Sequence, residues 1–313
     1  MNKIITLLFA TILLTTCKTS TEFLTIDGYT FEEFLAPGVR KISANFYADE
    51  RELSNIDYKE FMFWTKHIFG ETSIEYVKTI PDTTVWDKQK SFDLLPINYF
   101  KDPAFNAHPI VGVSLEQAKS YANWRTERVA EMILTSEKLI QSGTKQNRDN
   151  YFTIEKYLEG TYEFTLKVKP TLVLPKYTVP TIEEWETISG INSRSELGVD
   201  SLDKSNRKTI KDDLPLFNTK EVLIQKIETL SKSEESKIEF IPTTPTSTGY
   251  NNVYGLKNMI GNVSELVNKT GASKGGDWFH FLNDTDLNDK PPNSWTGFRN
   301  VCRLEVRKKQ NGK

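Results

Sequence analysis

The chain has 313 residues, of which 38% are hydrophobic, and this is enough to bury a substantial core in one large domain or two ordinary ones. Its 40 basic and 42 acidic side chains leave a formal net charge of −2, so we expect no nucleic-acid partner. The three histidines, His67, His108 and His280, lie far apart in the sequence. They do not have the spacing typical of ligands to zinc or non-haem iron.

Residues 1–17 have the pattern of a secretory signal. Lys3 precedes an apolar run over residues 4–14 that is too short to span a bilayer. The segment LTT before Cys17 resembles a bacterial lipoprotein box, which implies that Cys17 is lipidated and that the protein is anchored to a membrane without spanning it. An ordinary signal peptide that happens to contain a cysteine is the alternative. With Cys17 lipidated, Cys302 has no partner for an intramolecular disulfide.

After the signal, residues 18–39 are expected to form a tether. Partly alternating apolar and polar residues predict one strand over 41–53. Ser54 and Asn55 then offer N-cap oxygens to a helix. We expect its apolar face to include Phe61, Trp64 and Ile68.

Two capping boxes predict two further helices. One pairs Ser114 with Gln117, and the other pairs Thr181 with Glu184. The residues between and after these helices, 135–175 and 192–238, are expected to form polar insertions, with one helix near 221–230.

From residue 243 onward, short apolar runs alternate with turn residues, which predicts small strands joined by tight turns. Residues 308–313 form a basic tail. One elaborated α+β domain over residues 40–307 is the simplest account of these elements.

Six segments in a fixed order resemble the sulfatase-modifying factor family, the domain of formylglycine-generating enzyme. They are FYADERELSNIDYKEFMFW, HPIVGVSLEQAKSYANW, PTIEEWE, NVYGLKNMIGNVSEL, KGGDW and GFRNVCR. The resemblance implies a compact α+β fold with little regular secondary structure, related to C-type lectin-like folds. The insertion YFTIEKYLEGTYEF resembles one branch more closely, the lipoproteins of gliding motility and type IX secretion in Bacteroidetes.

Within this family, formylglycine-generating enzyme oxidises a substrate cysteine with copper held by two cysteine thiolates, which are the ligands that copper(I) prefers. A second branch uses iron held by histidines and a carboxylate, which the three scattered histidines of this chain do not reproduce. At the corresponding positions this chain has His280 and Thr285, and Asp277 replaces the serine after the glycine pair. No cysteine lies between Cys17 and Cys302. We therefore expect no copper, no iron and no catalytic residues, so that the protein is not an enzyme.

The segment GNVSELV, residues 261–267, matches a family motif that contributes to a structural calcium site. The resemblance implies that Asn262, the carbonyl of Val263 and Glu265 bind calcium, which accepts irregular sets of oxygen ligands. Both tryptophans of the family motif are replaced, by Ser264 and Leu266. The alternative is that Asn262 only caps or turns the chain while Glu265 is solvated.

Other motif residues have structural interpretations. Gly275 and Gly276 are expected where the backbone approaches a neighbour closely, and Arg299 is expected to pair with an internal carboxylate. Among the aromatic residues, Trp124, Trp185 and Trp278 are assigned to the core. Trp295, beside the turn residues PPNS, is the tryptophan expected to be exposed for binding.

These observations favour a non-catalytic, lipid-anchored protein of the outer membrane that faces the periplasm and acts through contacts with other envelope proteins. The resemblance suggests a place in gliding motility or type IX secretion machinery. A calcium-dependent module that binds glycans or other ligands is the alternative, and an oxidase of the formylglycine-generating type is a third hypothesis.

Overall fold

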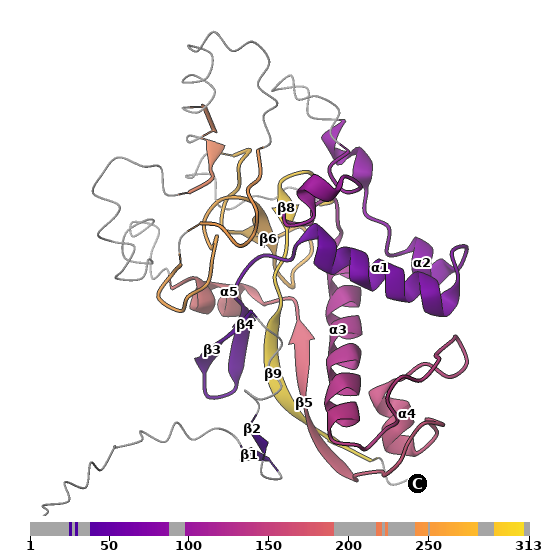
Figure 1. Ribbon diagram of the computed structural model, residues 1–313. Helices are drawn as coiled ribbons and strands as arrows, with labels where there is room; N and C mark the ends of the chain where they lie inside the picture. Colours follow the sequence, from indigo (N-terminus) through magenta and orange to yellow (C-terminus); the bar gives the residue numbers. More distant parts are fainter. Residues whose placement is uncertain are drawn as a thin grey trace, which may run out of the picture.

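The computed structural model describes residues 25–26, 29–30, 38–87, 98–190, 217–220, 223–224, 242–249, 251–280 and 291–309. Its elements confirm a mixed α+β fold with little regular secondary structure (Figure 1). The short strands β1 (Thr25–Ile26) and β2 (Tyr29–Thr30) pair within the expected tether. Most of the predicted insertion 192–238 and of its helix near 221–230 lies outside the described residues, as do Cys17 and Thr285.

A four-stranded antiparallel sheet of order β3-β4-β9-β5 forms the lower part of the domain in Figure 1. Its strands are β3 (Val39–Ser43), β4 (Phe46–Asp49), β5 (Thr171–Thr178) and β9 (Val301–Lys308). The longest pairing joins β5 to β9, from Thr171 opposite Lys308 to Thr178 opposite Val301. The last strand of the chain therefore lies in the centre of the sheet.

The single strand predicted over 41–53 is wrong, because a two-residue turn divides it into β3 and β4. Ser43 pairs with Phe46 across this turn, and Asn45 is a residue type that favours turns. Its side chain accepts a hydrogen bond from the Leu304 amide at 2.7 Å and donates one to the Leu304 carbonyl at 3.1 Å. Alternation alone does not reveal this turn, because it continues from one strand into the next.

The three helices predicted from their capping residues are confirmed, with their N-caps. Helix α1 (Asn55–Phe69) begins after Ser54, whose side chain accepts from the Asp57 amide. Both capping boxes form, so α3 (Leu115–Ser136) begins after Ser114 and α5 (Ile182–Ser189) begins after Thr181. Helix α1, followed by the short α2 (Ile74–Val77), crosses near the N-terminal end of α3, which runs beside the β5–β9 pair (Figure 1).

The expected insertion 135–175 is not a polar excursion over most of its length. It contains the end of α3, the helix α4 (Ile154–Glu159) and the first half of β5. Its apolar side chains enter one core cluster together with residues of α3, β5 and β9; they include Leu139, Ile140, Phe152, Tyr157, Tyr162, Leu172 and Leu174. Leu139, Ile140, Phe152 and Tyr162 lie outside the helices and strands, so no helical or strand period predicts that they are buried.

Residues 264–297 contribute the strands of a second sheet of order β7-β6-β8, as the pattern of short runs and turns predicts. Strand β6 (Ser264–Leu266) pairs antiparallel with β7 (Ser273–Lys274) and parallel with β8 (Thr296–Gly297). This sheet holds the predicted calcium segment and lies close to β4, β9 and α5 in Figure 1.

Candidate functional site

The chain enters β6 through two residues in the left-handed conformation, Gly261 at φ 79° and Asn262 at φ 62°. A Cβ on Gly261 would lie 2.9 Å from the Asn218 carbonyl oxygen, so this position requires glycine. The Asn262 amide donates to the same carbonyl at 2.7 Å. The GN pair of the motif therefore fits a close backbone approach to the segment around Asn218.

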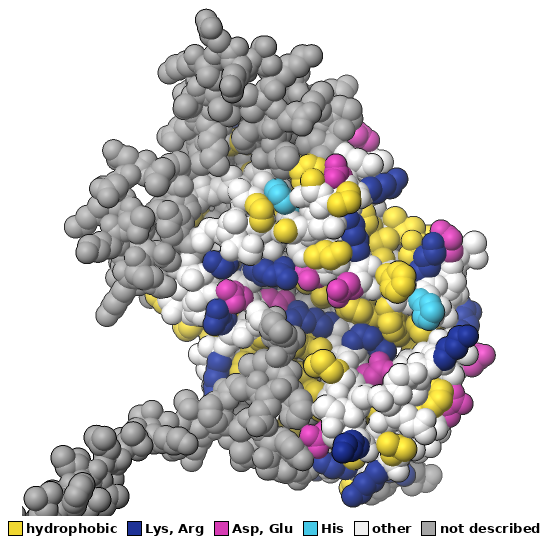
Figure 2. Space-filling model, in the orientation of Figure 1, with side chains coloured by type: hydrophobic (Ala, Val, Ile, Leu, Met, Phe, Trp, Pro, Cys, Tyr) yellow, Lys and Arg dark blue, Asp and Glu magenta, His cyan; other side chains and the backbone are white. Residues whose placement is uncertain are grey.

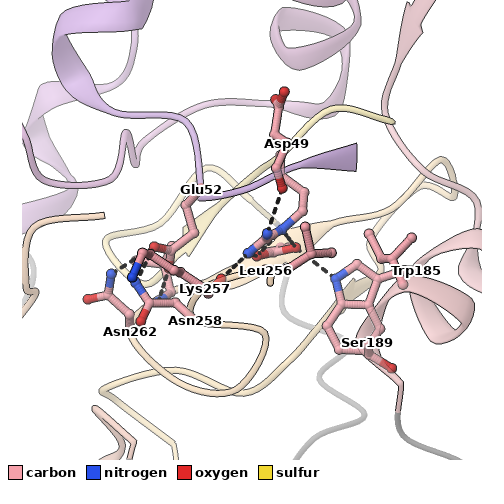
Figure 3. Close-up of polar contacts among 12 residues, drawn as sticks. Asp49, Glu52, Trp185, Ser189, Leu256, Lys257, Asn258 and Asn262 are labelled. Atoms are coloured by element: carbon pink, nitrogen blue, oxygen red, sulfur yellow. Dashed lines mark hydrogen bonds and ion pairs between the residues drawn. The ribbon is translucent and has the colours of Figure 1, made fainter. Parts of the chain in front are cut away.

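Glu265, in the middle of β6, accepts hydrogen bonds from two buried donors. The Arg299 Nε atom lies 2.7 Å from each carboxylate oxygen, and the Trp185 indole Nε1 donates to Oε2 at 2.8 Å (Figure 3). The side chains of Arg299 and Glu265 are 0% and 1% exposed. The expectation that Arg299 pairs with an internal carboxylate is confirmed, and the alternative of a solvated Glu265 is wrong.

A second carboxylate, Glu52, is buried close to this pair, between β4 and α1. It accepts from Asn258 Nδ2 at 2.8 Å and from Asn262 Nδ2 at 3.0 Å (Figure 3). Burial, followed by the negative charge of Glu265, raises the pKa of Glu52 to about 8, although Arg299 opposes the shift. Glu52 is therefore largely protonated at neutral pH.

The Asn262 side chain is also surrounded by hydrogen-bonding partners. Its Oδ1 atom accepts from the Thr244 amide at 2.9 Å and from Asn218 Nδ2 at 3.2 Å. Its Nδ2 atom donates to Glu52 and to the Thr244 carbonyl. Val263, next along the chain, is buried, and its amide lies 3.4 Å from Glu52 Oε1.

This arrangement does not fit the calcium ion predicted at Asn262, Val263 and Glu265. The Glu265 carboxylate already has a guanidinium against both oxygens, and that fixed positive charge would repel a divalent cation. The Asn262 oxygen is turned toward N–H donors. Among the described residues, no group of three or more His, Cys, Asp or Glu side chains is placed to hold a metal ion. The contacts instead join β6, the segment before β9, α5 and the segment before α1 through buried hydrogen bonds.

The segment after the glycine pair carries Asp277 and His280, which the resemblance assigns to catalytic positions of the family. Asp277 is buried, and its Oδ1 atom accepts from the amides of Phe279 and His280 at 2.8 Å each. The His280 Nδ1 atom lies 3.0 Å from the same oxygen. Asp277 thus fixes the turn after Trp278 and orients the half-buried His280 ring, which packs edge-on against Trp295.

Gly275 confirms the expected close approach, because an added Cβ would lie 3.0 Å from the Met259 carbonyl oxygen and 3.1 Å from Trp185. The core assignments of Trp185 and Trp278 are also confirmed, since both are buried. Trp124 is only partly buried. Trp295 is partly buried as well, and it stacks on Phe279 with ring centroids 4.5 Å apart.

Cys302 lies in β9, opposite Tyr47 of β4 and Tyr177 of β5. It is a free thiol and only 1% exposed. Burial raises its pKa well above the ordinary value, against the opposing effect of the Arg125 charge. This thiol is therefore both inaccessible and protonated at neutral pH.

Sequence reasoning missed Glu52 and Asn258. Glu52 stands in the charged stretch ADEREL, where a buried glutamate looks like any solvated one. Its partners Asn258 and Asn262 are separated from it by 206 and 210 positions. No local pattern signals a contact at that separation, so only the fold reveals this carboxylate.

In the part of the chain that the structure describes, no helix combines the length and apolar content needed to cross a membrane. Among curated proteins, no sequence matches this chain. Similar solved structures include the crystal structure of CarF, which is 17% identical, with 83% of this chain and 87% of that chain covered and a TM-score of 0.36.

The Treponema denticola variable protein 1 is 14% identical, with 82% of this chain and 84% of that chain covered and a TM-score of 0.35. The model of the sulfatase-modifying factor enzyme 1-like domain matches residues 17–308. Because this match spans nearly the entire sequence, the chain belongs to the family of sulfatase-modifying factor enzyme 1-like domains.

Proposed function

We propose that this protein is a non-catalytic member of its family, anchored by lipid at Cys17 to the periplasmic face of the outer membrane and acting through contacts with other envelope proteins. More specifically, we propose that it is a component of gliding motility or type IX secretion machinery. The observation that carries the non-catalytic part is the state of Cys302, the one cysteine after Cys17, which is 1% exposed and has a raised pKa.

The family's oxidation of cysteine requires two thiolates on one copper ion, and this chain has no second thiol inside the domain. Cys302 is held in the central strand of a sheet, whereas His280 occupies one of the two family cysteine positions. His280 is bonded to Asp277. An Asp–His pair lacks the soft sulfur ligands on which copper(I) chemistry depends.

The alternative of a calcium-dependent ligand-binding module depends on oxygen atoms of Asn262 and Glu265. Those atoms accept hydrogen bonds from Thr244, Asn218, Arg299 and Trp185. The contacts therefore favour a rigid scaffold over a calcium-dependent binding surface.

The catalytic question is tested with the purified full chain, copper(I), oxygen and a peptide that contains the sulfatase cysteine motif. We expect no aldehyde product by mass spectrometry, with an active formylglycine-generating enzyme as the positive control. Stoichiometric copper and an aldehyde product that depends on Cys302 would overturn the non-catalytic proposal. A thiol reagent should also label Cys302 only after unfolding, because the native thiol is buried.

The anchor is tested in cells by metabolic labelling with an alkyne fatty acid. We expect label on the wild type and none on Cys17→Ser, with the variant released from the membrane fraction. Equal membrane association of both proteins would contradict the anchor. The partner role is tested by cross-linking in intact envelopes before detergent extraction, where recovery of the protein without any cross-linked protein would count against it.

A further inference from the structure

A pocket of about 340 Å³ opens between the start of β3, the segment before α1, and helix α3. Many of its lining residues belong to two of the motif segments, residues 46–64 and 108–124, and the lining does not include Asp277 or His280. The side chains that matter here are Arg51, Glu60, Tyr121, Trp124, Arg125 and Arg128. Figure 2 shows basic and acidic side chains interleaved with hydrophobic ones over the middle of the face that carries α1 and α3.

Arg125 is a largely buried cation that lines this pocket. Its Nη1 atom donates to Asp49 Oδ2 at 2.7 Å, and its guanidinium lies 4.1 Å from the centre of the Tyr177 ring. The side chain is 14% exposed. A guanidinium has five N–H donors in a fixed plane, so the bond to Asp49 leaves most of this capacity for an acceptor in the pocket.

Trp124 and Arg128 also line the pocket. They stand four positions apart on α3, and therefore on one face of the helix. Trp124 Nε1 and Arg128 Nε are buried, and neither has a hydrogen-bond partner among the described residues. Both atoms lack solvent-accessible surface, so they are not open to a ligand, and the two residues contribute the surface of the Trp124 ring and of the Arg128 side chain to the pocket.

The acidic side chains of the pocket differ in whether they already have hydrogen-bond or ion-pair partners. Asp57 accepts from Arg51 at 2.8 Å and from the Ser54 amide at 3.0 Å, and Asp49 is bonded to Arg125. Glu60, by contrast, lies exposed on α1 and forms no hydrogen bond or ion pair in the described part of the chain. It is the carboxylate of this pocket that remains open to a cation.

Apolar and aromatic surface completes the pocket through Tyr121, Trp124, Leu53 and Val129. Burial raises the pKa of the Tyr121 hydroxyl; the charge of Arg125 opposes the shift and that of Glu60 adds to it. The ring of Tyr121 therefore lies within electrostatic reach of charges of both signs.

We propose that this pocket binds a free α-amino acid, with its carboxylate on Arg125, its ammonium on Glu60 and its side chain against Tyr121 and Trp124. The internal pairs Arg51–Asp57 and Arg125–Asp49 keep the pocket close to neutral, and this favours a zwitterion over a multiply charged anion such as phosphate. The volume lies within the range of small-molecule sites. The inference is independent of the envelope role proposed above.

The test is isothermal titration of the purified full chain with each of the common amino acids, and then with the N-acetyl and C-amide derivatives of any that bind. We expect at least one amino acid to bind, and each derivative to bind about tenfold or more weakly, because each loses one charge-assisted contact. The C-amide derivative tests the carboxylate subsite without changing a buried arginine.

Glu60→Gln is the matching variant, because Glu60 is exposed and the change removes only its negative charge. This variant should bind the amino acid about tenfold more weakly than the wild type does. Its binding of the N-acetyl derivative, which lacks the ammonium, should equal that of the wild type. Glu71→Gln, just beyond the same helix and outside the pocket, is the control and should leave both unchanged. The proposal is overturned if no amino acid binds at concentrations up to about 10 mM, which corresponds to a weak dissociation constant. Equal binding of the N-acetyl derivative, or no effect of Glu60→Gln, would also overturn it.

Discussion

Arg299 and Glu265 form an ion pair that is buried from solvent, with Arg299 Nε 2.7 Å from both carboxylate oxygens. The same guanidinium donates to the Asp49 carbonyl at 3.0 Å and to the Lys257 carbonyl at 2.7 Å. Four segments of the chain therefore meet on one side chain. A buried guanidinium with its donors satisfied in this way fixes the relative positions of the two sheets.

Replacing Arg299 should be among the most damaging single changes. Arg299→Met leaves Glu265 buried and without its cation, and we expect a loss of about 3–5 kcal/mol in the free energy of unfolding. Urea denaturation of the purified wild type and variant measures this difference in the free energy of unfolding. The control is Arg303→Ala, because Arg303 is 47% exposed where it pairs with Glu184, and such pairs contribute at most about 1 kcal/mol. Similar losses for both variants would contradict the assigned importance of the buried pair.

Glu52 should make stability depend on pH between about 4.5 and 8. Its pKa is raised from 4.5 to about 8 in the folded protein, so the folded state holds a proton that the unfolded state releases. Its contribution is fully present below pH 4.5 and is lost as the pH rises through 8. As the pH rises across this window, we expect the free energy of unfolding to fall less in Glu52→Gln than in the wild type, by on the order of a few kcal/mol.

The comparison uses the difference between variant and wild type at each pH, because other groups titrate in the same window. Glu116→Gln is the control, since Glu116 has an 82% exposed side chain and should follow the wild-type curve. Parallel curves for Glu52→Gln and the wild type would show that Glu52 is ionised in the folded state.

Calcium should leave the protein's stability unchanged. The carboxylate of Glu265 is held by Arg299 and Trp185, so we expect equal melting temperatures with excess Ca²⁺ and with a chelator. A ligand that binds only the folded state at one hundred times its dissociation constant would add about 2.7 kcal/mol. A calcium-dependent rise in melting temperature that disappears in Glu265→Gln would restore the predicted calcium site.

Gly275 should tolerate alanine less well than Gly271. Both have positive φ, 100° and 74°, so both alanine variants carry backbone strain of about 1–3 kcal/mol. Only at Gly275 does the new Cβ also meet backbone and ring atoms, whereas nothing lies within 4 Å at Gly271. We expect Gly275→Ala to be the less stable variant in thermal unfolding, by about 1–3 kcal/mol. Equal stability of the two would show that the neighbours of Gly275 move aside.

The sequence alone predicted the features that depend on neighbouring residues. The capping boxes at Ser114 and Thr181 were predictable because their hydrogen bonds span three positions. The turn-rich strands after residue 243 and the α+β class follow from similarly local patterns. The ordered motif series, taken together, was specific enough to point to the family that residues 17–308 match.

Only the tertiary structure decided how the charged residues are used. Three glutamates show this: Glu116 is exposed, Glu52 is buried and protonated, and Glu265 is fully paired. Their states depend on Asn258, Asn262 and Arg299, which are brought in from distant parts of the chain. Burial and electrostatic interactions act through space, so no window of neighbouring residues contains the information that sets them.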